Sequence, residues 1–521
     1  MKLHSVLALR TVSAAVLVVL AGCAVGPDYQ PSAANAPTDF TAWHGGSAEL
    51  LAPSPSPSPA APAPFTWRGF ADPTLDALQA RALTANSDLK TAALRFAQSR
   101  VQGDAVRSQQ WPQVNASGSA ARVRESENGD FRRIIGALNP GAVDELVKVL
   151  SDPHDMFQAG FDASWELDFW GRVRRSIEAA DANEAAQQAL LAQAQLSVQA
   201  ELARHYFQLR SVQSQLRLAR ADIAAGAQTR ELVAARADGG LTTDLDVTRQ
   251  DAQLADARAR LPQLLSQEAA EMNQITLLLG ERPGALQAEL AARPDAVQPA
   301  ALPDLSLGLP SDVALRRPDI RGAEAQLHAA TAGIGVAVAD LYPRITLGAS
   351  FGLNSVDANT FTDWGSRQWQ VGPSLQLPIF DGGRRRATVT LRKLQAQEAA
   401  VAYQQTVLKA WQEIDDALSA YTAERQRNAQ LALKEHSSRD AYQLAGVRYQ
   451  HGLTDFLVQL DAQRTLLQAQ RDYAESSGRL AIALVSISKA LALPVDAAEA
   501  SPVAQASEGP VALGALAPRG K

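Results

Sequence analysis

The sequence predicts an α+β protein built from two tandem repeats, each with two amphipathic strands and a long helical hairpin. Three short sequence motifs from the first half of the chain recur in the same order in the second half, and two of them recur about 211 residues later, as a tandem duplication requires. Each repeat also carries stretches that alternate apolar and polar residues, and then long proline-free stretches with apolar residues at helical spacing.

The first residues predict secretion and membrane anchoring. Lys2 and Arg10 precede a short apolar run that ends in Leu-Ala-Gly-Cys, the form of a secretory signal with a small-residue cleavage site. The position of Cys23 resembles a bacterial lipobox, which implies cleavage before this residue and its acylation. Ala24 is not the aspartate of an inner-membrane retention signal, and this favours the outer membrane. The alternative is an ordinary signal peptide followed by an incidental cysteine.

Composition excludes several classes of protein. Lys and Arg total 49 against 55 Asp and Glu, so the net charge is -6 and the chain lacks a basic nucleic-acid footprint. Cys23 is the only cysteine, which excludes an intrachain disulfide and a cysteine-based zinc site. No apolar stretch of about 18 residues follows residue 22, so no helical membrane span is expected in the mature chain.

Four stretches alternate with period two and predict strands with one apolar and one polar face. They are Gln113 to Val123, the weakest, and then Phe157 to Phe169, Ile345 to Leu353 and Trp369 to Ile379. Their lengths match tilted transmembrane β-strands, which need about 9–11 residues, and aromatic residues concentrate around them. A sheet in a soluble sandwich is the alternative. Pro373 and Pro378 are awkward, because proline cannot donate to a ladder.

The remaining chain predicts long helices. Residues 172–237 and 384–450 contain no proline, and apolar residues step by three, four and seven, as in coiled-coil seams. Gly239, Gly240 and Gly452 mark the helix turns, because glycine suits the left-handed position that ends a helix. Pro318 and Asp319 predict the start of another helix.

Strands in lipid must close into a barrel, because an open edge leaves backbone groups unpaired in hydrocarbon. Closed bacterial barrels begin at about eight strands, and one chain offers four. A dimer would supply eight strands and a trimer twelve. The larger barrel is the better conduit, since a barrel of about eight strands is nearly filled by its own side chains.

Four segments carry a resemblance to a known family: CAVGPDYQP (Cys23 to Pro31), WELDFWGRVRRSIEAA (Trp165 to Ala180), GLPSDVALRRPDIRGAEAQLHAATAGIG (Gly308 to Gly335) and GLTDFLVQLDAQRTLLQAQRDYA (Gly452 to Ala474). In this order they resemble the TolC-like outer membrane factors, in the NodT-type lipoprotein branch that serves resistance-nodulation-division (RND) efflux pumps. The resemblance implies a homotrimer with a 12-stranded outer-membrane β-barrel, continued by an α-helical coiled-coil barrel in the periplasm. It also implies a periplasmic adaptor (membrane fusion) protein, an inner-membrane RND pump and outer-membrane lipid as partners, with no cofactor. An exit duct of a type I secretion system is the alternative.

The expected domain organisation follows the repeats. A signal peptide (1–22) precedes a lipid-anchored segment with a Pro/Ser spacer (23–72). Repeat 1 consists of a first helix (73–110), a β-hairpin (111–170) and a helical hairpin (171–285), and a connector (286–317) follows it. Repeat 2 consists of a first helix (318–342), a β-hairpin (343–380) and a helical hairpin (381–492), and a tail (493–521) ends the chain.

The resemblance also implies a periplasmic gate at the helix turns. Its candidate residues are Leu457, Asp461, Arg464, Asp244 and Asp246. Leu457, Asp461 and Arg464 occupy positions i, i+4 and i+7, so they share one helix side. Threefold symmetry would place three Asp461 carboxylates around the axis, and this acidic ring would attract cations. The alternative is that Asp461 pairs locally on a solvated helix face.

No catalytic or metal site is expected. Gly348 to Gly352 fits the nucleophile-elbow pattern of hydrolases, but Ser350 lies within an alternating strand rather than at a strand-to-helix turn. No histidine pair has metal-ligand spacing, and no P-loop is present. A membrane-anchored coiled-coil interaction protein without a pore is a further alternative.

Overall fold

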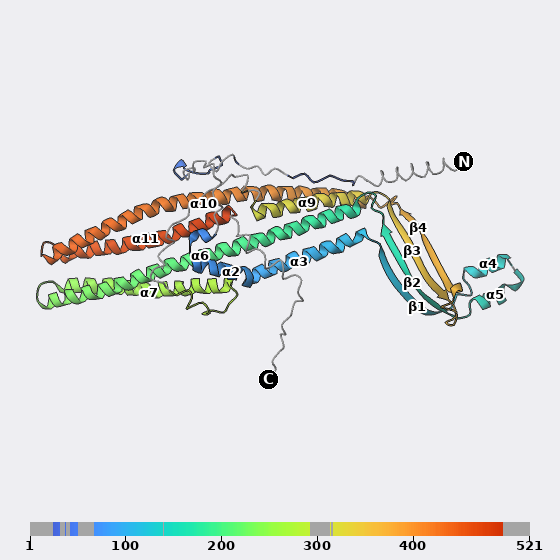
Figure 1. The fold of residues 1–521 in the computed structure, drawn as a ribbon, viewed down its shortest axis with the longest axis horizontal. Helices are drawn as coiled ribbons and strands as arrows, with labels where there is room; N and C mark the ends of the chain where they lie inside the picture. The colour runs from blue at the N-terminus through green and yellow to red at the C-terminus, as the bar shows by residue number, and fades with distance from the viewer. Residues whose placement is uncertain are drawn as a thin grey trace, which may run out of the picture. The chain divides into compact units, whose positions relative to one another are not determined.

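The computed structural model describes residues 24–31, 37, 42–50, 67–138, 140–291, 313 and 316–492 (Figure 1). The predicted signal peptide with Cys23, the whole Pro/Ser stretch of residues 53–64, residues 292–312 of the predicted connector and the C-terminal tail lie outside the described residues. The chain forms two compact units. One comprises Met1–Gln30, Ser99–Glu184 and Gln326–Ala400, and the other comprises Pro31–Gln98, Ala185–Ala325 and Val401–Lys521.

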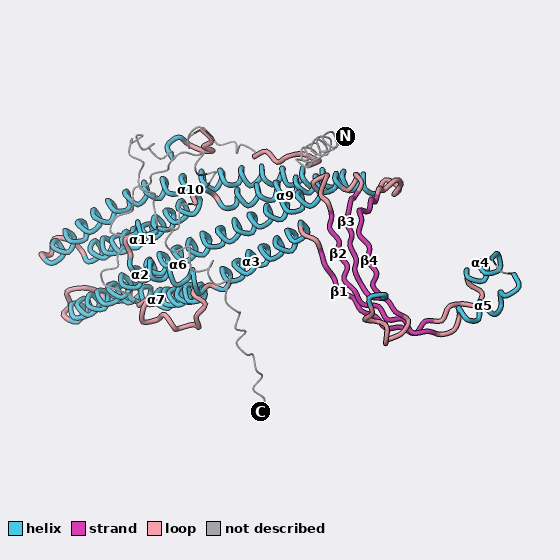
Figure 2. The backbone as a smooth tube through the Cα atoms, turned by 45° about the vertical axis from the view of Figure 1, so that its right-hand side comes forward, coloured by secondary structure: helices cyan, strands magenta, loops and turns pink. Residues whose placement is uncertain are grey.

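The first unit contains one antiparallel sheet whose four strands pair in chain order (Figure 2). The strands are β1 (Gln113–Val123), β2 (His154–Glu166), β3 (Arg344–Ser355) and β4 (Arg367–Gln376). The strands predicted from the alternation are therefore present, with shifted ends. β4 stops before Pro378, and Pro373 is accommodated because β4 is an edge strand.

The strand register confirms the two different faces of the sheet. Phe161 of β2 lies opposite Phe351 of β3, which lies opposite Trp369 of β4. These three aromatic side chains form a ladder that is 52–70% exposed within the chain. The next row is polar: Asp162 faces Ser350, and Asn115 Nδ2 of β1 donates to the Asp162 carboxylate at 3.1 Å.

The sheet also carries an insertion that the sequence analysis did not predict. Two short helices, α4 (Asp130–Leu138) and α5 (Val143–Leu150), interrupt the connection between β1 and β2, where a plain β-hairpin was expected. Figure 1 shows them beyond the ends of the strands. The segment was missed because the helices have only nine and eight residues, fewer than the about 10–12 residues over which a helical pattern is recognised.

The helices repeat in length as the duplication predicts. α6 (Arg172–Asp238) and α10 (Arg384–Gln450) each have 67 residues, and α7 (Asp244–Leu278) and α11 (Phe456–Ala490) each have 35. The remaining long helices are α2 (Pro73–Ala85), α3 (Ser87–Arg107) and α9 (Pro318–Ala339). Among the described helices none is long and apolar enough to cross a membrane.

Side chains at the helix ends explain several boundaries. Asp72 caps α2 by accepting from the backbone N–H groups of Thr74 and Leu75, at 2.9 and 3.3 Å. Asn86 serves two helices, because its Oδ1 accepts from the start of α3 and its Nδ2 donates to the Leu278 carbonyl at the end of α7. α9 begins at Pro318, as predicted.

A buried arginine links three helices of the second unit. Arg317 Nη1 donates to the carbonyl of Ala490 at 2.7 Å and so caps the last turn of α11. Its other nitrogens bind Asp319 at 2.6 and 3.0 Å and Glu413 of α10 at 2.7 Å. Arg317 is 5% exposed, so these bonds replace its hydration.

Candidate functional sites at the strand–helix junction and the helix turns

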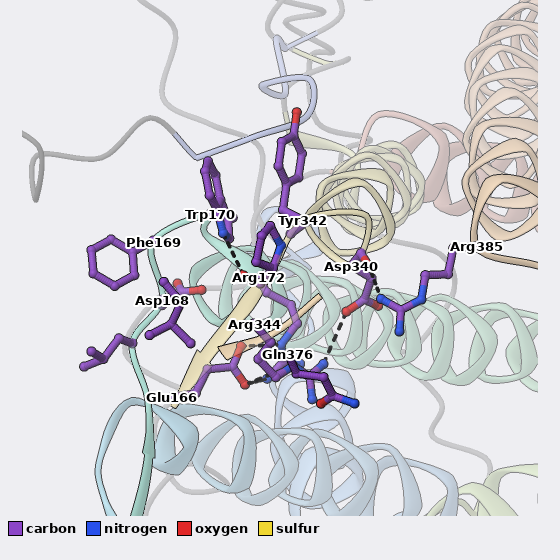
Figure 3. A pocket seen from close by; sticks show the side chains of 14 residues that line it. Glu166, Asp168, Phe169, Trp170, Arg172, Asp340, Tyr342, Arg344, Gln376 and Arg385 are labelled. Carbon is purple, nitrogen blue, oxygen red and sulfur yellow. Dashed lines mark hydrogen bonds and ion pairs between the residues drawn. The ribbon is translucent and has the colours of Figure 1, made fainter. Parts of the chain in front are cut away.

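The first site lies in the first unit, where β2 passes into α6 and α9 into β3 (Figure 3). Glu166 accepts two bonds from Arg172, both at 2.8 Å, and this pairing raises the pKa of the guanidinium. Arg344 lies 3.8 Å from Glu166 and 3.3 Å from Asp340. The residues surround a cavity of about 150 Å³. Paired charges of this kind hold the turn in place.

Aromatic rings lie beside these charges. Trp170 stacks on Tyr342 with ring centroids 4.7 Å apart, and its indole N–H donates to the Pro343 carbonyl at 2.9 Å. Gly171 takes a positive φ of 80°, and Asp168 then caps α6 by accepting from the backbone of Val173 and Arg174. Residues 169–175, at the passage from β2 into α6, therefore form a capped turn.

The segment that follows Cys23 docks on this junction. The backbone N–H of Val25 donates to the Trp170 carbonyl at 3.1 Å. Asp28 pairs with Arg175, which is 5% exposed. Tyr29 stacks on His328 of α9 with centroids 4.3 Å apart. The described chain thus places the residues next to the predicted lipid anchor against the turn after β2, against α6 and against α9.

Two glycines make this docking possible. Gly26 has a φ of 97°, and a Cβ on it would lie 2.6 Å from the Cα of Gly335 in α9. A Cβ on Gly335 would in turn lie 2.8 Å from the Arg175 side chain. Sequence reasoning treated the Cys23 to Pro31 motif only as a resemblance, since its partners are more than 100 positions away.

The second site is formed by the two helix turns of the second unit. Gly240 and Gly452 take positive φ values of 73° and 70°. Leu241 N–H donates to the Arg236 carbonyl at 2.8 Å, and Leu453 N–H donates to the Arg448 carbonyl at 2.9 Å. The two turns are thus built alike, as the duplication predicts. Gly239 precedes Gly240 without a positive φ.

The predicted gate residues of α11 occupy one exposed side of the helix. Leu457 is 52% exposed, and Asp461 and Arg464 are also exposed. Within the described part of the chain, no ion pair joins Asp461 or Arg464 to another side chain. The local pairing considered for Asp461 is therefore not seen among these residues.

The acids of the first turn differ from each other. Asp244 is exposed at the start of α7. Asp246 instead accepts from the hydroxyls of Thr242 and Thr243 at 2.7 and 3.1 Å. The bond from Thr242 is the main cause that lowers the pKa of Asp246. Its carboxylate is tied into its own turn, in a way that Asp461 is not.

A contact between the two hairpins lies next to the turns and was missed by sequence reasoning. Val233 of α6 is fully buried against Phe456 and Leu460 of α11, with Val247 and Tyr449 packed around them. The Arg236 guanidinium lies 4.7 Å from the centre of the Tyr449 ring. The heptad spacing identifies Val247 and Leu460 as apolar seam positions, but it does not show which helix each one meets.

Farther along the same helices, Asp222 of α6 lies 3.8 Å from Arg471 of α11. Burial raises the pKa of Asp222 and lowers the pKa of Arg471. Within the described residues no cluster of His, Cys, Asp and Glu is suited to hold a metal ion.

Comparison with known proteins identifies the class. The sequence profile of the family described as outer membrane efflux protein matches residues 78–281 and 309–493, so both repeats are covered. The chain therefore belongs to the outer membrane efflux protein family. It is the outer-membrane channel component of an efflux pump and not an enzyme. Ser350, paired with Asp162 in mid-sheet, is accordingly a strand residue.

Particular relatives extend the match over nearly the whole chain. The chain is 31% identical to the outer membrane protein OprJ of Pseudomonas aeruginosa over 478 residues, which cover 91% of this chain and 94% of that protein. It is 32% identical to the toluene efflux pump outer membrane protein TtgF of Pseudomonas putida, over 88% of this chain and 92% of that one.

Solved structures share the fold. The outer-membrane channel OprN aligns with a TM-score of 0.77 and 33% identity, over 91% of this chain and 99% of that one. The open state of the MtrE channel of Neisseria gonorrhoeae aligns with a TM-score of 0.74 and 28% identity, over 90% and 98% of the two chains. The TolC-like fold with four strands and duplicated long helices is thereby confirmed.

Proposed function

We propose that three copies of this chain form the passive exit duct of a tripartite efflux pump of the RND type. The main support for this proposal is that the sheet has two free edges. β1 and β4 each have one neighbour within the chain, and the aromatic ladder of Phe161, Phe351 and Trp369 is exposed. A sheet with an apolar outer face and free edges is stable in lipid only when closed. Three copies close a 12-stranded barrel with room for a channel.

The substrates are proposed to be drugs or organic solvents. Relatives are described as toluene, solvent and antibiotic efflux pump outer membrane proteins, all from Pseudomonas putida. A wide aqueous duct has few contacts with which to select a compound, so selection belongs to the pump. Energy likewise comes from the inner-membrane RND pump, coupled through a periplasmic adaptor protein.

The anchor and the gate complete the proposal. Acylation of Cys23 would insert lipid beside the strand–helix junction, since Ala24 and Val25 lie against Gly171 and Trp170. The exposed Asp461 side chains of three copies would form an acidic ring at the periplasmic end, with Leu457, Arg464 and Asp244 nearby. The division of the chain into an anchored segment, two repeats with a connector, and a tail is part of the same proposal.

Two measurements test it. The detergent-solubilised protein is expected to have the mass of a trimer, and planar bilayers containing it are expected to show discrete channel openings. A monomer that never conducts would support the coiled-coil interaction protein instead. A type I secretion duct would give the same channel openings in bilayers. The adaptor and the inner-membrane partner recovered by in-cell cross-linking therefore decide between an RND efflux pump and a type I secretion system.

A further inference from the structure

The α4–α5 insertion between β1 and β2 is a small helical hairpin with its own core. Val147 is 3% exposed between the helices, and Gly136 approaches the side chain of Val143. Arg132 of α4 and Asp144 of α5 form an ion pair at 2.8 Å across the hairpin. These contacts hold the two helices together without help from the sheet.

Six large apolar side chains of this hairpin are exposed, whereas Val147 is buried. The exposed side chains are Phe131 (46%), Ile134 (48%), Leu138 (80%), Leu146 (41%), Val149 (71%) and Leu150 (45%). Their spacing of i, i+3, i+7 on α4 and i, i+3, i+4 on α5 makes one row on each helix. In an antiparallel pair with Val147 facing inward, both rows fall on one side of the hairpin. A contiguous apolar face of this kind marks an interaction site.

Lipid is a poor occupant for this face. β1 and β2 have 11 and 13 residues, already enough to cross the hydrocarbon layer, which takes about 9–11 per strand. Figure 1 shows the hairpin beyond the ends of the strands, so in the proposed barrel it would lie beyond that layer. The connecting segment 124–153 holds four basic and six acidic residues, so no excess of cations attracts anionic lipid headgroups.

Other copies of the same chain are better occupants of this face. β1 is an edge strand, so in the proposed trimer the hairpin that follows it would stand at the boundary between two copies. Twelve strands about 4.8 Å apart and tilted by about 40° enclose a radius of about 12 Å. The nine residues of α4 span about 13 Å, so a hairpin turned inward is long enough to reach the axis of such a barrel.

We propose that the α4–α5 hairpins of three copies pack their apolar faces against one another around the threefold axis. They form an apolar collar that narrows the outer mouth of the duct. This inference rests on the proposed trimeric barrel, and its partner is a second copy of this chain.

Cysteine cross-linking in the full-length protein tests the collar. Leu138→Cys, on the apolar face, is expected to give covalent dimers and trimers with a short bis-maleimide in intact cells. Arg133→Cys, exposed on the opposite side of the same helix, is the matched control and is expected to give none. The parent protein, treated with the same reagent, measures any background cross-linking through Cys23.

Two results would overturn the collar. One is a trimer by mass whose Leu138→Cys variant does not cross-link. The other is a bimane label on this cysteine whose emission shifts to the blue in lipopolysaccharide vesicles but not in the detergent-solubilised trimer, since the face would then meet lipid. A monomeric mass would refute the barrel itself, so the two failures are distinguishable. Ile134→Glu is expected to increase single-channel conductance, because charge opens an apolar constriction to water.

Discussion

Gly478 of α11 packs directly against Ser211 of α6, and a Cβ on Gly478 would lie 2.6 Å from the Cβ of Ser211. Ser211 is 7% exposed, so it is buried in the contact. The two helical hairpins therefore approach each other here at a distance that only glycine permits.

Gly478→Ala is expected to lower the thermal midpoint, with a loss of about 1–3 kcal/mol from overpacking. Gly446→Ala, at a position of α10 where a Cβ would make only an ordinary contact with Gln459 at 3.9 Å, is the control and is expected to be neutral or slightly stabilising, because alanine favours helix. Combining Gly478→Ala with Ser211→Gly is expected to restore the midpoint. Failure of this rescue, measured by circular dichroism, would show that the contact is not the cause.

Arg317→Lys is expected to destabilise the protein by about 2 kcal/mol, because lysine cannot reach Ala490, Asp319 and Glu413 together. Arg316→Lys, at the exposed neighbouring position, is expected to have no effect. Thermal unfolding of both variants in detergent measures the difference. Equal midpoints would contradict the capping role of Arg317.

The turn at Gly240 is expected to loosen in acid. The pKa of Asp246 is lowered in the fold by the Thr242 hydroxyl, so its stabilisation is present above the unfolded pKa of about 3.9 and is lost as the pH falls through the folded pKa. Hydrogen exchange, corrected for intrinsic rates, is expected to show weaker protection of residues 241–250 below about pH 4.

Two comparisons control this experiment. Asp246→Asn is expected to remove most of the pH dependence. The second turn, where Val458 holds the equivalent position near Gly452, is expected to show much less of it. Loss of protection at both turns together would point to global unfolding instead.

Asp461→Asn is expected to reduce the preference of the channel for K⁺ over Cl⁻ in planar bilayers, because the proposed ring of three carboxylates loses its charge. Asp251→Asn, an acid of α7 whose charge is already paired with Arg230 at 2.9 Å, is the control and is expected to leave selectivity unchanged. Equal permeability ratios for the parent and the Asp461 variant would place this residue outside the pore.

Tyr29→Ala is expected to free the segment after the anchor, because its stack on His328 is lost. Asp28→Ala is expected to act in the same direction, since it removes a partner of the buried Arg175. The measurement is the rate of protease cleavage within residues 24–31, with Gln30→Ala, exposed between them and the spacer, as the control. Cleavage at the parent rate would mean that neither contact holds the segment.

The sequence by itself determined the order and type of the elements. Alternation in Phe157 to Phe169 specified a strand with an aromatic face, since side chains in a strand change sides at every residue. Glycines at 240 and 452 specified the helix turns, and Pro318 with Asp319 specified a helix start. Each of these rules acts within a few neighbouring residues, so the local sequence contains all that it needs.

Only the tertiary structure decided which surfaces meet. Gly478 against Ser211, Tyr29 on His328 and Arg317 at the Ala490 carbonyl join residues far apart in the chain, and no periodicity encodes their pairing. The α4–α5 hairpin was hidden for a related reason, since helices this short depend on packing rather than on their own propensity. Local pattern fixes what each segment is, while shape and charge in three dimensions fix what it touches.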